Sequence, residues 1–74
     1  MNEKSREYAM DLLVSMVVAY RAEKENRLQE EIWSEFRRSQ TYENLLNPDT
    51  GLWMNGPDYI SDEYDLELAR GTKA

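Results

Sequence analysis

The chain has 74 residues with no cysteine and no histidine, and its 15 acidic and 9 basic side chains give a formal charge of −6. This length allows a single small domain, residues 1–74, and the missing residue types exclude disulfides, common zinc sites, thiolate nucleophiles and histidine-based catalysis. We therefore expect a protein that is not an enzyme and that needs no cofactor and no metal.

The acidic charge is concentrated in the second half of the chain. Residues 1–40 contain seven Lys or Arg against eight Asp or Glu, whereas residues 41–74 contain two against seven, a net charge of −5. An acidic surface disfavours direct binding to nucleic acid or to anionic membranes. We expect instead a protein partner, which could itself be basic.

The apolar run from Leu12 to Tyr20 is similar to the core of a signal peptide. It is too short to span a bilayer, and Glu3 and Glu7 lie where a signal peptide is basic. A small-residue cleavage site is also missing after it. We therefore expect a cytoplasmic protein.

The first predicted element is a helix over about residues 5–25. Its apolar residues form two adjacent stripes at helical spacing, which together cover roughly 240° of the circumference, against about 100° for an ordinary surface helix. Such a helix has to be covered from two directions, by the rest of the chain or by a second copy. The first stripe contains Ala9, Leu12, Leu13, Met16, Val17 and Tyr20, and the second, which is the candidate dimer face, contains Met10, Val14 and Val18.

Asn26 is the predicted break before a second helix over about residues 27–40. Asn tolerates the left-handed conformation at a helix C-terminus and also serves as an N-cap. Leu28, Ile32 and Phe36 then form the apolar stripe of the second helix. One continuous helix is the alternative, but a hairpin is favoured because a small chain must fold back to bury its apolar faces.

A short helical turn and a tight turn are predicted next. The turn-forming sequence NPDTG at 47–51 follows the apolar residues of the segment 42–46, and it could close a short β-hairpin near 45–54. The same segment fails as a calcium loop, because Leu52 and Asp58 stand where an EF-hand needs Gly and Glu.

The last predicted element is a helix near residues 57–69. Pro57 suits its first position, Asp58 complements its positive end and Gly71 suits its C-terminal cap. The alternation of apolar and acidic residues over 64–68 leaves a strand as the alternative there.

The expected fold is therefore mostly α: a small helical hairpin with a C-terminal segment of turns and helix docked onto it. The ends of the chain, about residues 1–4 and 71–74, are expected to fray.

Trp33 and Trp53 are the largest side chains of the chain, and two interpretations are open for them. Both could pack together in the core, or Trp53 could join Met54 and Tyr59 in a partly exposed anchor, since Trp, Tyr and Met are enriched at the centres of interfaces. The core interpretation is favoured, because the turns on both sides of Trp53 fold it back towards the helices of the chain.

The acidic residues near the C-terminus are a second candidate surface for a partner. Paired carboxylates could act in glycoside hydrolysis, but they need a pocket that separates their acidities, so a solvated helix face is favoured. The same carboxylates could also imitate a nucleic acid. The set contains Asp58, Asp62, Glu63, Asp65 and Glu67.

Three short motifs occur in a notable order: WxxF at 33–36, GPDYI at 56–60, and Tyr64 with Leu68 one turn later. Over about residues 9–68 this order resembles a family of small uncharacterised bacterial helical proteins, classed as a domain of unknown function and often encoded beside toxin-like genes. The resemblance implies no catalytic residues. It implies a binding or accessory role near a toxin locus.

The leading hypothesis is a non-catalytic protein-binding module, an antitoxin-like or regulatory partner. The alternatives are an acidic nucleic-acid mimic that inhibits a nuclease or DNA-binding protein, and a purely structural homodimer. Salt distinguishes the first two, because a mimic loses affinity steeply as ionic strength rises and an apolar anchor does not.

Overall fold

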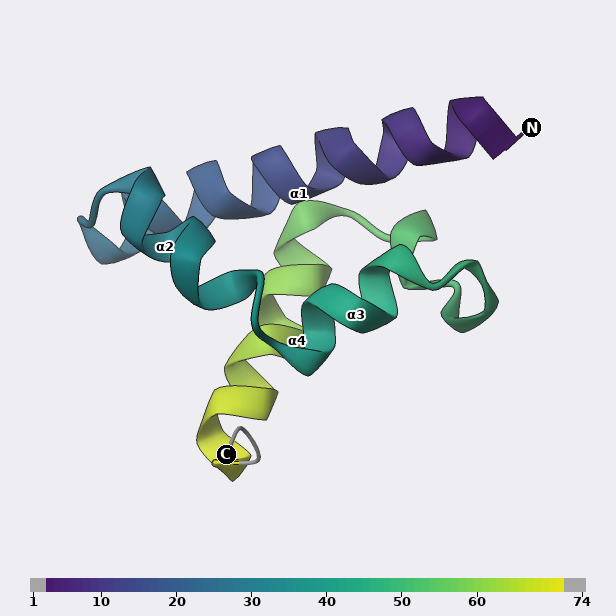
Figure 1. Cartoon of the computed structure of the whole chain (residues 1–74). Helices are drawn as coiled ribbons and strands as arrows, with labels where there is room; N and C mark the ends of the chain where they lie inside the picture. Colours follow the sequence, from purple (N-terminus) through teal and green to yellow (C-terminus); the bar gives the residue numbers. More distant parts are fainter. Residues whose placement is uncertain (1–2, 72–74) are drawn as a thin grey trace.

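The structure is a computed structural model that describes residues 3–71, and within them it contains four α-helices and two short 3-10 helices (Figure 1). The mostly α fold is therefore confirmed. Fraying was predicted for residues 1–4 and 71–74. Residues 1–2 and 72–74 lie outside the described residues, whereas α1 already begins at Glu3 and Gly71 is the C-cap of α4. In chain order the elements are α1 (Glu3–Glu25), α2 (Gln29–Phe36), α3 (Gln40–Leu46), η1 (Pro48–Thr50), η2 (Leu52–Met54) and α4 (Pro57–Arg70).

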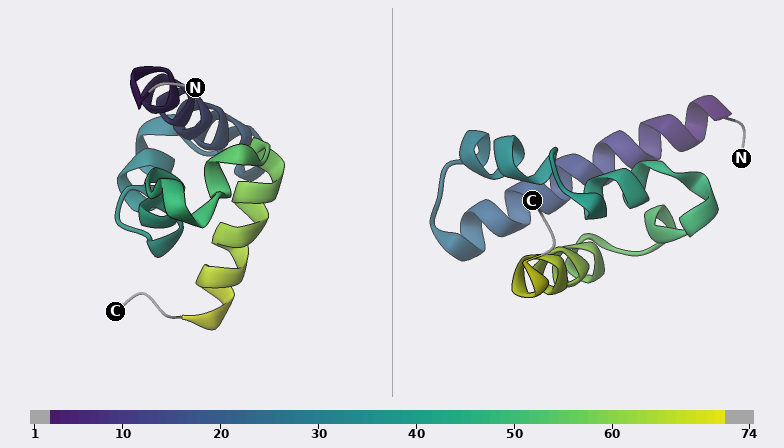
Figure 2. Two further views of the ribbon diagram at one scale, coloured as in Figure 1. Left: turned by 90° about the vertical axis from the view of Figure 1, so that its right-hand side faces the viewer. Right: turned by 60° about the horizontal axis from the view of Figure 1, so that its bottom comes forward.

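The long helix α1 has one covered side and one open side. Helices α2, α3 and α4 all lie on the same side of it, and the two views of Figure 2 agree with Figure 1 in this arrangement. The C-terminal helix α4 runs crosswise to α1, and α1 packs mainly against α4 and α2. The described residues thus cover α1 from one side, and the predicted cover from a second direction is missing, since Leu12, Met16 and Tyr20 stay exposed.

The break at Asn26 is confirmed, and the continuous helix is ruled out. Asn26 has a φ of 55°, in the left-handed region. The amide of Arg27 donates to the carbonyl of Ala22 (2.9 Å) and the amide of Asn26 to that of Glu23 (3.3 Å), which is the Schellman pattern that ends a helix. The chain therefore reverses here and lays α2 against α1.

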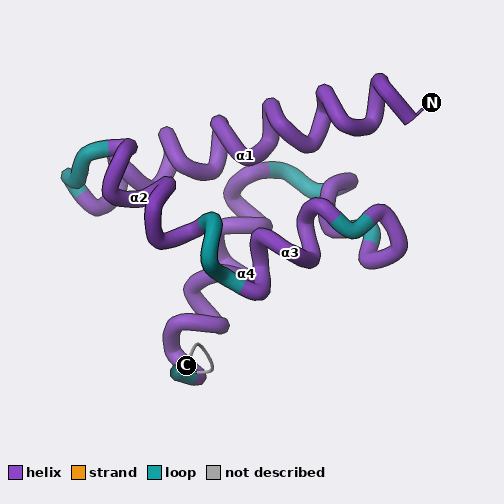
Figure 3. The backbone as a smooth tube through the Cα atoms, viewed as in Figure 1, coloured by secondary structure: helices purple, strands orange, loops and turns teal. Residues whose placement is uncertain are grey.

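The β-hairpin predicted near residues 45–54 is wrong, because residues 3–71 contain no strand (Figure 3). Each half of the segment closes on itself instead: Thr50 donates to the carbonyl of Asn47 and Met54 to that of Gly51, both at 3.1 Å. Gly51 joins the two turns with a φ of 71°, which only glycine adopts easily. These backbone groups are thus used in local turns and not in a ladder between strands.

The strand alternative over residues 64–68 is also wrong, because they lie inside α4. Pro57 is at its start, as predicted, and Gly71 ends it with a φ of 63°. Because α4 is helical, its residues no longer alternate between two faces, and Tyr64 and Glu67 lie on its buried side.

The second predicted helix, 27–40, is shorter in the structure, because α2 ends at Phe36, and the short helical turn predicted over 42–46 lies in α3, which begins at Gln40. Ser39 is the N-cap of α3, and its hydroxyl accepts from the amide of Tyr42 (3.0 Å). Residues 37–39 thus form a corner that redirects the chain.

The core lies where the covered side of α1 meets the other helices. Phe36 and Tyr64 are at its centre and pack edge to face with their ring centroids 5.0 Å apart, and Tyr42 packs against Phe36 at 5.7 Å. Such aromatic pairs add to the free energy of burial of the rings themselves. The buried residues of the cluster are Val17, Val18, Ala22, Ile32, Phe36, Leu45, Ile60 and Tyr64.

Arg21 joins α1 to α4 inside this core, although it is charged and only 4% exposed. Its Nη1 donates to the carbonyl (3.2 Å) and hydroxyl (2.8 Å) of Ser61 and to Asp65 (2.7 Å), and its Nη2 pairs with Glu25 at 2.7 Å. The guanidinium also lies 4.6 Å from the ring centroid of Tyr64. These contacts compensate for the removal of its charge from water.

Candidate functional site

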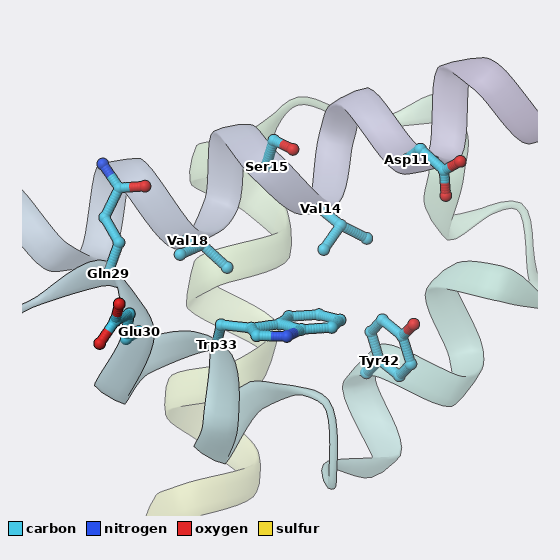
Figure 4. A pocket seen from close by; sticks show the side chains of 8 residues that line it. All are labelled: Asp11, Val14, Ser15, Val18, Gln29, Glu30, Trp33 and Tyr42. Carbon is cyan, nitrogen blue, oxygen red and sulfur yellow. The ribbon is translucent and has the colours of Figure 1, made fainter.

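A groove of about 470 Å³ runs between α1 and the α2–α3 segment. Figure 4 shows the indole of Trp33 lying across it, with Val14 and Val18 projecting from α1 towards one face of the ring. Tyr42 closes one end, where its ring meets that of Trp33 edge to face at 5.5 Å between centroids. The groove is therefore an apolar slot with an aromatic wall.

Acidic residues stand at both ends of this groove. Asp11 lies at the end near Tyr42, and Glu30 lies at the other end beside Gln29 (Figure 4). Both acidic residues are exposed, and the ion pairs found within residues 5–71 involve neither of them. The groove thus offers apolar surface in the middle and free negative charge at the rim.

The neighbouring carboxylates of α2 are paired with Arg27, which follows the break at Asn26 and also contacts Glu25. Its guanidinium makes two contacts with Glu35, at 3.0 and 2.6 Å, and it also reaches Glu31 at 3.5 Å. The hydrogen bond from Arg27 lowers the pKa of Glu35, and the bond to Glu35 raises the pKa of Arg27. Glu30 stays outside this network, so its charge remains available at the groove.

Of the predicted anchor Trp53, Met54 and Tyr59, Trp53 is partly buried and packs against the core cluster. Met54 and Tyr59 are exposed. Trp33 was predicted to be a core residue packed against Trp53, and this is wrong for Trp33: it is 38% exposed, and its ring partner among the described residues is Tyr42. The partly exposed anchor of Trp53, Met54 and Tyr59 stays a prediction.

The predicted acidic surface of α4 is divided by the fold. Glu67 is only 4% exposed, and it accepts hydrogen bonds from the amides of Gln40 (3.0 Å) and Thr41 (2.9 Å) at the start of α3. Its assignment to a partner surface is therefore corrected: it fastens α3 to α4.

The other acidic residues of α4 are not equivalent to one another either. Asp65 is paired with Arg21 at 2.7 Å and lies 3.7 Å from Lys24. Asp58 and Asp62 are exposed, and Glu63 is half-buried. The continuous run of negative charge that a nucleic-acid mimic requires is thus reduced to two fully exposed residues of the predicted five.

The predicted dimer face is also corrected. Met10 and Val18 are buried within the chain, at 5% and 6% exposure, and Val14 is half-buried in the groove. α1 therefore uses this stripe to bind its own neighbours, and it leaves the other predicted stripe partly in solvent.

The sequence did not indicate Asp11 and Tyr42 as neighbours of Trp33, because they come from α1 and α3, whereas Glu30 precedes Trp33 by three residues on α2 itself. One signal was present: Trp33 lies outside the i, i+4 stripe of its own helix, and a large aromatic residue there indicates an additional contact surface.

Comparison with known proteins finds no family model, no curated protein and no solved structure that matches the chain. The predicted resemblance to a bacterial family therefore stays a prediction. Among residues 3–71, no helix combines the length and the apolar character needed to cross a bilayer. In the same range no group of three or more metal-binding side chains is placed to hold an ion.

Proposed function

We propose that this chain is a non-catalytic protein-binding module whose groove between α1 and the α2–α3 segment accepts an arginine side chain of a basic partner. The observation that carries the proposal is the combination of the indole face of Trp33 with free carboxylates at both ends of the groove. The resemblance to proteins encoded beside toxin-like genes adds an antitoxin-like or regulatory role as the proposed context.

The chemistry of the groove suits arginine better than a purely apolar residue. A guanidinium stacks on an aromatic face, and Trp is the strongest partner for a cation. The aliphatic part of the same side chain would pack against Val14 and Val18, and its charge would be balanced by Asp11 or Glu30. An apolar side chain would use the middle of the groove but would gain nothing from its charged ends.

The test uses two small probes that differ in charge and little in shape, Nα-acetyl-arginine amide and Nα-acetyl-citrulline amide. We expect the arginine probe to shift the NMR signals of the Trp33 indole and of the Val14 and Val18 methyl groups. A single side chain should give a dissociation constant on the order of 1–10 mM. The citrulline probe should cause much smaller shifts.

Two variants decide whether the groove itself is responsible. The double variant Asp11→Asn, Glu30→Gln should abolish the shifts, while the matched control Asp58→Asn removes an exposed charge of α4 and should leave them unchanged. Equal shifts with both probes, or shifts that the double variant retains, contradict the proposal.

A further inference from the structure

The open side of α1 carries a continuous apolar stripe. Tyr8, Leu12, Met16 and Tyr20 follow one another at intervals of four residues and are 73%, 49%, 42% and 40% exposed. They form one i±4 ridge, the surface feature that interdigitates when helices pack. Figures 1 and 2 show the other helices on the opposite side of α1, so nothing in residues 3–71 covers this ridge.

The four members of the stripe are uncharged in a chain that carries −6. Ser15 and Ala19, which are small, neutral and exposed, lie beside its centre, whereas charge is found towards its ends, at Asp11, at Glu23 and at Lys24, whose ammonium lies 5.8 Å from the ring centroid of Tyr20. The exposed surfaces of α2 and α4, by contrast, carry acidic residues such as Glu31 and Asp62. Two copies of an acidic chain repel each other least when they approach through a neutral face.

From this face we infer a homodimer in which the α1 helices of two copies pack antiparallel through the Tyr8–Tyr20 stripe. A two-fold axis near residue 14 places Tyr8 of one copy beside Tyr20 of the other, and Leu12 beside Met16. The order Tyr, Leu, Met, Tyr is thus nearly the same read from either end, which is the self-complementarity that an isologous contact needs. Tyrosines at the ends keep their hydroxyls in water while their rings cover the aliphatic centre.

The size of the stripe fits a second copy that binds reversibly. The four side chains expose on the order of 400 Å² per copy, which is the size of patch that marks interaction sites on small proteins. Two copies with their flanking residues reach the low end of specific interfaces, where dimers are weak and exchange readily. None of the four stripe residues lines the groove, although Ser15 beside them does, so the dimer inference does not rest on the proposed arginine binding.

Sedimentation equilibrium on the intact chain tests the inference. We expect the weight-average mass to rise from the monomer value of 8.8 kDa towards twice that value between about 10 and 500 µM, the range for a weak dimer. Leu12→Glu and, separately, Met16→Lys should keep the chain monomeric with an unchanged helical circular dichroism spectrum. Leu66→Glu, a matched change at an exposed leucine of α4, should dimerise like the wild type.

The orientation is tested by cross-linking, which the absence of native cysteine makes simple. With a short bismaleimide, a mixture of Tyr8→Cys and Tyr20→Cys chains should give the mixed dimer. Each variant alone should give little product, because its two thiols would lie about 18 Å apart along the helices. A wild type that stays monomeric over the whole concentration range, or efficient cross-linking of Tyr8→Cys to itself, overturns the inference.

Discussion

Arg21 shows how a single charged residue can act as a core residue in a small domain. It follows Val17 by one helical turn, so it continues the buried stripe of α1 and brings its charge with it. The Ser61 hydroxyl accepts a hydrogen bond from the Arg21 guanidinium, and Asp65 of α4 and Glu25 of α1 form ion pairs with it. Its Nε is buried without a hydrogen-bond partner among the described residues, so the cluster is nearly but not fully satisfied.

Replacing Arg21 by Met should therefore be costly even though Met fills similar space. The change leaves Asp65 and Glu25 without their partner, but both carboxylates are partly exposed to solvent. We therefore expect a loss of about 2 kcal/mol in the free energy of unfolding, which is less than for a fully buried pair. Urea denaturation measures it. Lys24→Met removes an exposed pairing with the same Asp65 and should cost less than about 0.5 kcal/mol. Equal losses for the two variants would show that Arg21 has no special role.

Tyr64 makes the stability sensitive to alkaline pH. Burial raises the pKa of its hydroxyl above the ordinary value of 10.0. Above pH 10 the unfolded chain therefore releases this proton before the folded chain does. Its contribution to stability is complete below pH 10 and is lost as the pH rises from there towards the raised pKa.

As the pH rises from about 9 to 11, the free energy of unfolding should accordingly fall less in Tyr64→Phe than in the wild type. Urea denaturation at several pH values provides the measurement. Tyr59→Phe changes an exposed ring and should give the wild-type pH profile. If the Tyr64→Phe profile is parallel to that of the wild type over this interval, the buried hydroxyl is not the cause of the alkaline loss.

At the scale of the elements, Glu67 supplies hydrogen-bond acceptors for amides at the start of α3 that the residues next to α3 leave without a partner. The first amides of a helix have no partner within the helix, and Ser39 satisfies one of them. Glu67 of α4 accepts from the two amides before that one, those of Gln40 and Thr41, and also from the Thr41 hydroxyl (2.8 Å). The short helix α3 is therefore held at its N-terminus by a residue 26 positions later in the chain than Thr41.

Glu67→Ala should lower the free energy of unfolding by about 2–3 kcal/mol, because it leaves buried donors unsatisfied. It should also accelerate hydrogen exchange at the amides of Gln40 and Thr41, which distinguishes the loss of this contact from a general weakening of α4. Glu63→Ala, one turn earlier and half-buried, is the control and should affect neither amide. Unchanged exchange in Glu67→Ala would disprove the cross-helix cap.

The elements that were predictable from sequence are those whose signals are local. Asn26, Pro57 and Gly71 mark helix ends through their own backbone preferences, and these ends were predicted correctly. The segment 45–54 was not, because its turn residues suit both a hairpin and consecutive 3-10 turns, and the choice depends on where the core lies. The groove depends on the same long-range packing, since its walls come from α1, α2 and α3.

At the scale of the whole molecule, the apolar arc of α1 was predictable but the division of its residues was not. Periodicity shows that two stripes exist, and it cannot show which of them the later helices cover. Val14 and Val18 were therefore predicted to meet a second copy, whereas the structure turns them inwards and leaves Leu12 and Met16 outside. The crosswise position of α4 decides this, because Ile60 and Tyr64 cover the other side of α1.

All four α-helices of the described residues contribute to a single core cluster, so the domain should unfold as one unit. Trp53 tests this from a peripheral element, the short helix η2, which packs on the cluster through Leu52 and Trp53. A domain of this size has a net stability of roughly 3–5 kcal/mol. Because Trp53 is partly rather than fully buried, Trp53→Ala should remove about 2–3 kcal/mol of it, somewhat less than a fully buried tryptophan.

The loss caused by Trp53→Ala should appear in every helix at once. We expect the melting temperature to fall in a single transition, with far-ultraviolet circular dichroism and Trp33 fluorescence changing together. Met54→Ala, in the same short helix but exposed, should melt like the wild type. If Trp53→Ala melts at the wild-type temperature, Trp53 is not a core residue, and its surface becomes the next place to look for a partner. If the two signals separate, α1 and α2 form a unit that does not need the C-terminal half of the chain.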